Sequence, residues 1–215
     1  MAIPAIAPYP LPAERDLPAP RAGWSLDPAR AVLLIHDMQN YFLDPFAGAP
    51  LPTILANIGR VRAAAARAGV PVVFTAQPGG QTPRQRGLLR DLWGDGIGTA
   101  PRSSRIVDAL APGDDDTLLI KWRYSAFART ELAALLAATG RDQLIVTGVY
   151  AHIGCQITAV EAFMRDVQPF FVADAVADFS AGHHRAALAY VAECCAVPIV
   201  TGRSIEALTP SAQPA

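Results

Sequence analysis

Six short apolar runs alternate with segments of helical periodicity along most of this chain, and this alternation limits the folds open to it. Runs that are apolar at nearly every position are typical of parallel strands buried on both faces. Strands that alternate with helices predict a parallel sheet covered by helices on both sides. We therefore predict an α/β fold of three layers, α/β/α, around a six-stranded parallel sheet. The predicted strands are 31–35, 70–74, 117–120, 144–147, 169–172 and 197–200.

The helices between these strands are predicted from apolar spacing and from residues typical of helix ends. Gly69 and Gly140 suit helix C-termini, and Thr130 and Ser180 suit N-caps. The predicted helices are 53–68, 84–92, 103–110, 130–138, 153–165 and 180–194.

Three segments of different character are expected within the 215 residues, a length that suits one domain. Residues 1–22 are rich in proline, which removes backbone donors and fixes φ, so they predict an extended N-terminal arm. The arm also carries apolar side chains, which we expect to pack on its own domain or on a neighbouring subunit. Residues 23–208 form the predicted folded domain, and residues 209–215 form a tail.

The charge balance and the cysteine count narrow the partners of the chain. A net charge of −1 gives no electrostatic reason to expect nucleic acid or an anionic membrane surface. The apolar runs are too short to cross a bilayer, and the N-terminus lacks the basic and apolar regions of a secretion signal. The three cysteines suit reduced thiols, so we expect a cytoplasmic protein.

Polar groups follow three of the predicted strands. Asp37 comes just after the first strand, Lys121 directly after the third, and the turn from Tyr150 to Gly154 after the fourth. In an open parallel sheet these strand ends lie along one edge, so the three groups can meet there. On spacing alone, a capping role for Asp37 and a solvated surface role for Lys121 remain open.

Five segments of this chain, in this order, resemble those of isochorismatases, which belong to a broader superfamily with nicotinamidases and other cysteine hydrolases. The resemblance runs from the end of the arm to about residue 205. It implies an isochorismatase-like, Rossmann-like sheet and hydrolysis of an enolpyruvyl (vinyl) ether with release of pyruvate. The segments are AVLLIHDMQ (31–39), TAQP (75–78), KWRYSAF (121–127), GVYAHIG (148–154) and VADAVADFS (172–180).

The implied reaction needs an acid rather than a nucleophile, because protonation of the terminal vinyl carbon gives an oxygen-stabilised cation that water captures. The resemblance makes Asp37 the candidate acid, with Lys121 beside it. An aspartate with a pKa near 3.9 is ionised at pH 7, so we expect the negative charge of the substrate to assist its protonation. The cysteine hydrolases carry their nucleophile at the position of Gly154, where a side chain would crowd the substrate.

The expected substrate is a chorismate-derived dicarboxylate, which needs hydrogen-bond donors. The resemblance favours Arg86 as a bidentate clamp over the neighbouring arginines. Gln77 can donate an amide hydrogen, and Tyr150 with the backbone around Gly154 can bind an anion. Apolar walls for the ring are expected from three aromatic residues: Tyr124, Trp93 and Phe42.

No metal and no cofactor are expected. Nicotinamidase relatives carry metal-binding histidines in the loop after the first strand, and here residues 44–52 contain none. The apolar arm and self-associating relatives favour a homodimer or larger homo-oligomer. Some family members are fused to an aryl carrier domain, so we expect this chain to work with a separate carrier protein or in a pathway that needs none.

Three alternatives remain open at this stage. The first is a cysteine amidohydrolase that uses Cys155, although a shift of one residue on a helix turns a side chain by about 100° away from Asp37. The second is a scaffold without catalysis. The third concerns the substrate: isochorismate is favoured slightly, and 2-amino-2-deoxyisochorismate, which leads to phenazines, is the alternative.

Overall fold

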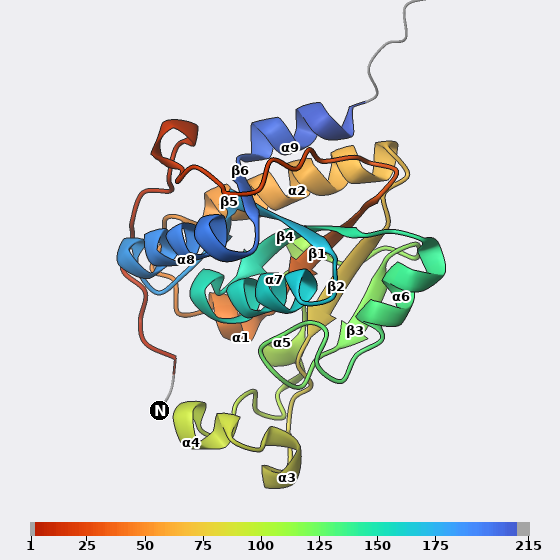
Figure 1. The fold of residues 1–215 in the computed structure, drawn as a ribbon. Helices are drawn as coiled ribbons and strands as arrows, with labels where there is room; N and C mark the ends of the chain where they lie inside the picture. The colour runs from red at the N-terminus through yellow and green to blue at the C-terminus, as the bar shows by residue number, and fades with distance from the viewer. Residues whose placement is uncertain (1–2, 210–215) are drawn as a thin grey trace, which may run out of the picture.

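The computed structural model describes residues 3–209, and its six strands form one parallel sheet (Figure 1). The strands pair in the order β3-β2-β1-β4-β5-β6, which confirms the predicted fold class. Each strand lies close to a predicted run: β1 (Ala31–His36), β2 (Val72–Ala76), β3 (Thr117–Ile120), β4 (Gln143–Val149), β5 (Gln168–Ala177) and β6 (Val197–Ile199).

Helices cover both faces of the sheet (Figure 1). Helix α2 (Leu51–Arg67) and helix α9 (Thr201–Leu208) pack on one face. Helices α6 (Leu132–Thr139), α7 (Gln156–Phe163) and α8 (Ala181–Cys194) pack on the other. From β1 the chain adds β2 and then β3 on one side. It then adds β4, β5 and β6 on the other side of β1, so the strand order reverses between β1 and β4.

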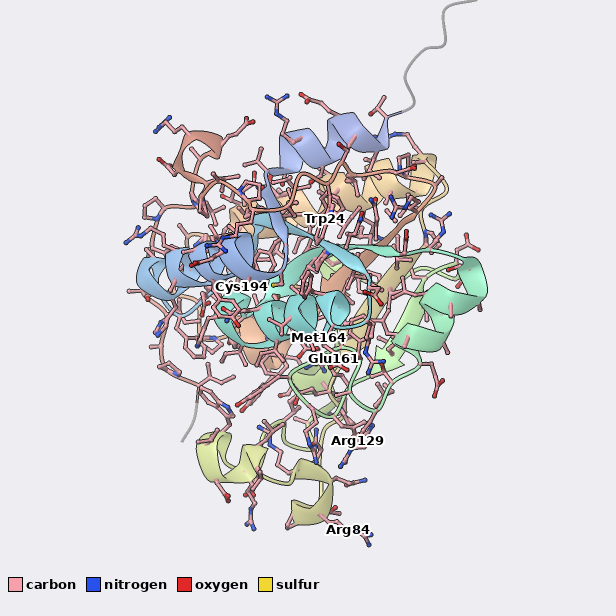
Figure 2. The ribbon with its side chains drawn as sticks, in the orientation of Figure 1. Trp24, Arg84, Arg129, Glu161, Met164 and Cys194 are labelled. Carbon is pink, nitrogen blue, oxygen red and sulfur yellow. The ribbon has the colours of Figure 1, made fainter. Side chains whose placement is uncertain are left out.

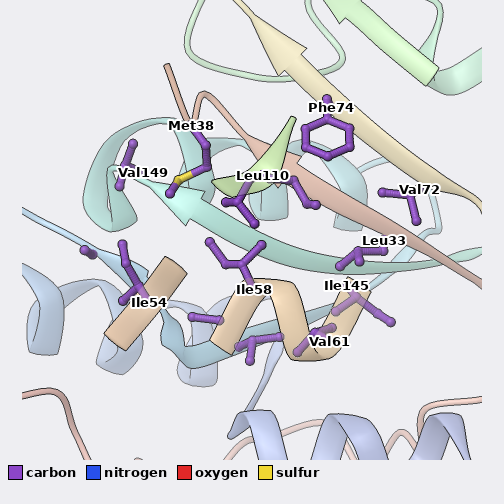
Figure 3. Packing of buried hydrophobic residues seen from close by; sticks show 14 of the residues in the cluster. Leu33, Met38, Ile54, Ile58, Val61, Val72, Phe74, Leu110, Ile145 and Val149 are labelled. Atoms are coloured by element: carbon purple, nitrogen blue, oxygen red, sulfur yellow. The ribbon is translucent and has the colours of Figure 1, made fainter. Parts of the chain in front are cut away.

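The core beneath α2 shows why this helix forms where it does. Ile54, Ile58 and Val61 follow a helical spacing and face Leu33 and Ile145 of the sheet (Figure 3). All five side chains are fully buried. Burial of each such aliphatic side chain contributes roughly 1.5–3 kcal/mol, so this face fixes α2 against the sheet.

The N-terminal arm packs on its own domain. Ile6 is fully buried and pairs with Phe46 in a parallel bridge. The hydroxyl oxygen of Tyr9 accepts a 2.7 Å hydrogen bond from the backbone N–H of Asp178. Of the predicted tail, residues 210–215 lie outside the part that the structure describes. None of the helices in residues 3–209 combines the length and the apolar character needed to span a bilayer.

The predicted helix 103–110 is wrong. The chain instead forms α5 (Pro101–Ser104), an extended segment and a 3-10 turn (Asp108–Leu110). The extended segment bonds to residues far away in sequence, because the backbone of Asn40 donates to Arg105 and that of Val107 donates to Met38. These tertiary hydrogen bonds replace the local ones of a helix.

The predicted helix 84–92 is divided into α3 (Pro83–Arg86) and α4 (Leu89–Trp93). The break falls at Gly87, whose φ of 56° lies in the left-handed region that favours glycine. The two short helices project from the main body (Figure 1), and Arg84 marks the tip of this projection (Figure 2). Two helices were not predicted, α9 and the short α1 (Asn40–Leu43).

Candidate active site

A pocket opens at the carboxyl ends of β1 to β4, at the point where the strand order reverses. Open α/β sheets form ligand sites at this place. The empty space of the pocket, with its open mouth included, is about 490 Å³. All nine candidate site residues line it: Asp37, Phe42, Gln77, Arg86, Trp93, Lys121, Tyr124, Tyr150 and Gly154.

A buried ion pair lies at the base of the pocket. The Nζ atom of Lys121 is 2.8 Å from Oδ2 of Asp37, and the two residues are 1% and 3% exposed. Thr75 Oγ1 donates a 2.7 Å hydrogen bond to the other carboxylate oxygen, and Gln77 donates to Oδ2 at 3.3 Å. The backbone of Asp37 has a φ of 49°, a conformation that aspartate tolerates and that is often found at functional sites.

The charges of this pair follow from its surroundings. Burial favours the neutral form of Asp37, but the adjacent Lys121 and the hydrogen bonds that Lys121 and Thr75 donate favour the carboxylate. The pKa of Asp37 therefore lies below its usual value. Burial also lowers the pKa of His36, so that ring is neutral near pH 7 and Lys121 supplies the positive charge. The site without ligand thus holds a carboxylate and an ammonium.

Arg86 is the second cation of the pocket. It is 5% exposed, and its guanidinium donates to the Gln77 side-chain oxygen at 3.1 Å and to the Gly94 carbonyl at 3.1 Å. Burial lowers its pKa, and it makes no ion pair with any residue from 3 to 209. A buried guanidinium without a carboxylate partner, placed on a pocket wall, is suited to bind an anion.

Three aromatic residues of the pocket wall, Trp93, Tyr124 and Tyr150, have their polar atoms in hydrogen bonds. Trp93 Nε1 donates a 2.6 Å hydrogen bond to the Tyr124 hydroxyl. The Tyr150 hydroxyl donates to the backbone carbonyl of Phe42. Tyr150 therefore lines the pocket with its hydroxyl hydrogen already bonded within the protein. Burial raises the pKa of Tyr150, so the phenol stays neutral.

The glycine and the cysteine that follow the fourth strand have separate surroundings. Gly154 lines the pocket within a π-helical turn (Ala151–Cys155) that leads into α7. Cys155 is fully buried in the core on the α7 side, with its sulfur 3.9 Å from the carbonyl oxygen of Thr147. Burial raises the pKa of this thiol well above its usual value. The geometry therefore excludes Cys155 as the nucleophile of this pocket.

Sequence reasoning missed three polar residues that shape the site. Thr75 holds Asp37, and His36 forms part of the pocket wall. Gln39 bonds to the backbone of Gln77 through both of its side-chain polar atoms, at 2.7 and 2.8 Å. Thr75 lies at the end of β2 beside Asp37, two residues before the predicted Gln77, so the neighbouring strand end could have indicated it. No grouping of three or more potential metal ligands was found among residues 3–209.

The isochorismatase domain model matches residues 31–202 of this chain. A protein named isochorismatase from Bacillus subtilis is 54% identical over 97% of this chain and 67% of its own length. The phenazine biosynthesis protein PhzD of Pseudomonas fluorescens is 55% identical over 93% of this chain and 96% of its length. Enterobactin synthase component B of Escherichia coli K12 is 47% identical, covering 100% of this chain and 76% of that protein.

Solved structures with the same fold include enzymes named for other chemistry. A cysteine hydrolase from Pseudomonas syringae superposes with a TM-score of 0.79 at 26% identity, over 89% of this chain and 99% of that one. An N-carbamoylsarcosine amidase from Thermoplasma acidophilum gives a TM-score of 0.69 at 25% identity, over 80% and 96%. The fold is thus shared with proteins named for cysteine hydrolase and amidase activity, so the pocket residues must decide the chemistry.

Proposed function

The chain belongs to the isochorismatase family, and we propose that it hydrolyses the enolpyruvyl ether of isochorismate to pyruvate and 2,3-dihydro-2,3-dihydroxybenzoate. The second candidate substrate is 2-amino-2-deoxyisochorismate, because relatives named for phenazine biosynthesis are as similar to this chain as the relative named isochorismatase. Both substrates are dicarboxylates with the same scissile bond, so the proposed chemistry is common to them.

One observation carries the proposal: Asp37 is the one carboxyl group among the described residues that line the pocket, and no thiol lines it. Hydrolysis of a vinyl ether requires a proton donor and water, whereas amide hydrolysis by the related cysteine enzymes requires a nucleophile. The unpaired guanidinium of Arg86 adds a place for a substrate carboxylate.

In the proposed mechanism, the carboxyl group of Asp37 transfers its proton to the terminal vinyl carbon, which becomes a methyl group. The electron pair of the double bond forms the new C–H bond, and the positive charge is shared by the adjacent carbon and the ether oxygen. Water adds to that carbon and gives up a proton to the Asp37 carboxylate. The resulting hemiketal then collapses to pyruvate and the ring alcohol, with a proton passing to the departing oxygen.

The test is a coupled lactate dehydrogenase assay of pyruvate release with each candidate substrate at matched concentrations. We expect turnover of at least one of them, and the ratio of the two kcat/KM values assigns the substrate. If neither substrate releases pyruvate while the folded protein binds them, the chain is a scaffold and the proposal is wrong.

We further propose that the protein is a homodimer or larger homo-oligomer in the cytoplasm and that it works with a separate aryl carrier protein. The apolar side chains of Leu118 and Ile120 on the edge strand β3 are about half exposed and support self-association. Light scattering of the purified chain would give the oligomeric state directly, and a monomer at all concentrations would refute it.

Arg86 is expected to bind a substrate carboxylate through its fork of donors. Lysine at this position keeps the charge but loses the bidentate geometry. Since a hydrogen bond to a charged group contributes about 1.5–3 kcal/mol, we expect R86K to raise KM roughly 10- to 100-fold with a smaller change in kcat. Steady-state kinetics check this, with the exposed Arg84 replaced by lysine as the matched control. An unchanged KM in R86K would remove Arg86 from the binding site.

The pH profile follows from the lowered pKa of Asp37 in the free protein. Only the protonated form donates, and kcat/KM reports the free enzyme, so kcat/KM should fall about tenfold per pH unit between about pH 5 and pH 8. The negative charge of bound substrate raises the pKa of Asp37, so kcat should stay level to a higher pH than kcat/KM. Parallel profiles, or rates that rise with pH, would contradict substrate-assisted protonation.

A further inference from the structure

Gly154 has no room for a side chain, and a single neighbouring residue is responsible. A Cβ atom added there would lie 2.1 Å from Cε1, 2.8 Å from Nε2 and 3.0 Å from Nδ1 of His36. The three nearest atoms to that position all belong to this one ring. The imidazole therefore fills the space into which a side chain on residue 154 would project.

The ring of His36 is held firmly in this place. Its Nδ1–H donates a 2.8 Å hydrogen bond to the carbonyl oxygen of Val149, and its Nε2 atom lies 3.2 Å from the carbonyl oxygen of Tyr124, which accepts from Lys121. The residue is 1% exposed, so rotation of the ring out of this position would require the surrounding core to open. A larger residue at position 154 is therefore excluded as long as His36 keeps this position.

We propose that His36 determines the reaction specificity of this pocket, by occupying the space that a nucleophilic side chain on residue 154 would need. Asp37 and Lys121 lie in the same pocket as Gly154, so a thiol there would have an acid–base partner and a cation close by. With the His36 ring in place, the pocket contains Asp37 as a proton donor but has no space for a nucleophilic side chain at residue 154. His36 acts through this exclusion and is a positioning residue.

The packing claim is tested by a double-mutant cycle of G154A, H36A and H36A/G154A. The added methyl group of G154A overlaps with the His36 ring, which cannot move aside. We therefore expect G154A to lose roughly 10- to 100-fold or more in kcat/KM, or to fail to fold. Shortening His36 makes room for the methyl group, so H36A/G154A should recover at least about tenfold of that loss. The matched control is G59A, since the helical Gly59 has nothing within 4 Å of its added Cβ and should keep full activity.

The specificity claim is tested with cysteine at position 154, in a C194S background that removes the exposed thiol of Cys194 at the end of α8 (Figure 2). In H36A/G154C the new thiol gains room beside Lys121, so iodoacetamide should alkylate it at least about tenfold faster than any cysteine of the C194S parent. With His36 intact, G154C should react slowly or fail to fold.

Alkylation requires no chorismate-derived substrate, so this measurement can succeed or fail independently of the proposed function on which the inference rests. Equal kinetics or equal insolubility of G154A and H36A/G154A would overturn the packing claim. Equal alkylation of G154C with and without His36 would overturn the specificity claim.

Discussion

Replacement of Asp37 by asparagine is expected to lower kcat by about 10²- to 10⁴-fold, the range that a positioned acid contributes to a reaction rate. Asparagine has nearly the same shape, and its oxygen can still accept the hydrogen bond that Thr75 donates at 2.7 Å. What the variant lacks is a transferable proton. The loss should therefore fall on kcat, while KM stays similar or decreases because Lys121 no longer has an anion beside it.

The measurement is pyruvate release under saturating substrate, with binding followed separately by calorimetry. Asp114 is exposed, so D114N is a matched control that should leave the kinetics unchanged. Circular dichroism should show the same fold for D37N and the parent. A D37N variant that binds substrate and still turns over at the parental rate would take the acid role away from Asp37.

The sequence could predict this site because the strand ends are fixed by the apolar runs. Asp37 and Gln77 follow runs that are buried on both faces, Lys121 follows the half-exposed edge strand β3, and all three line the same pocket. The partnership of His36 with Gly154 could not be predicted in this way. It depends on the approach of the His36 ring to the backbone of Gly154, where an added Cβ atom would lie 2.1 Å from Cε1, and only the folded structure shows this approach.

The limits of the fold prediction have a similar cause. Helix α2 was found because its apolar spacing faces one core. The segment around Ile106 has a helix-like sequence, yet it is extended because its backbone bonds to residues near position 40. Such long-range hydrogen bonds leave no local signal. Helix α9 is short, and its first turn is capped by Asp174, which accepts from the Thr201 backbone at 2.6 Å, so this cap too comes from a distant residue.

Replacement of Lys121 by methionine is expected to lower the free energy of unfolding by about 3–5 kcal/mol at pH 7, the usual cost of leaving one member of a buried ion pair alone. Methionine has a similar length, so the volume is nearly conserved. The Asp37 carboxylate would remain buried with no cation beside it. The carbonyl oxygens of Arg123 and Tyr124, which accept from Lys121 at 2.6 and 3.2 Å, would also lose this donor.

The pH dependence of this loss identifies its electrostatic part. In the parent protein the pKa of Asp37 is lowered, so the ion pair stabilises the fold above the unfolded-state pKa of about 3.9 and this contribution is lost in acid. In K121M the carboxyl group of Asp37 stays buried without a cation beside it, which raises its pKa. The variant is therefore destabilised at pH values where this carboxyl group is ionised. The difference in unfolding free energy should therefore shrink as the pH falls from 7 toward 4.

Urea unfolding of four proteins separates charge from packing: the parent, K121M, D37N and the double variant. Removal of both charges leaves no buried ion, so D37N/K121M should be less destabilised than the sum of the two single variants. Strict additivity, together with a loss that does not change with pH, would mean that Lys121 stabilises the fold through its carbonyl contacts alone. The dependence on both partners is the result that the 2.8 Å pair predicts, because each charge is tolerated in this core only beside the other.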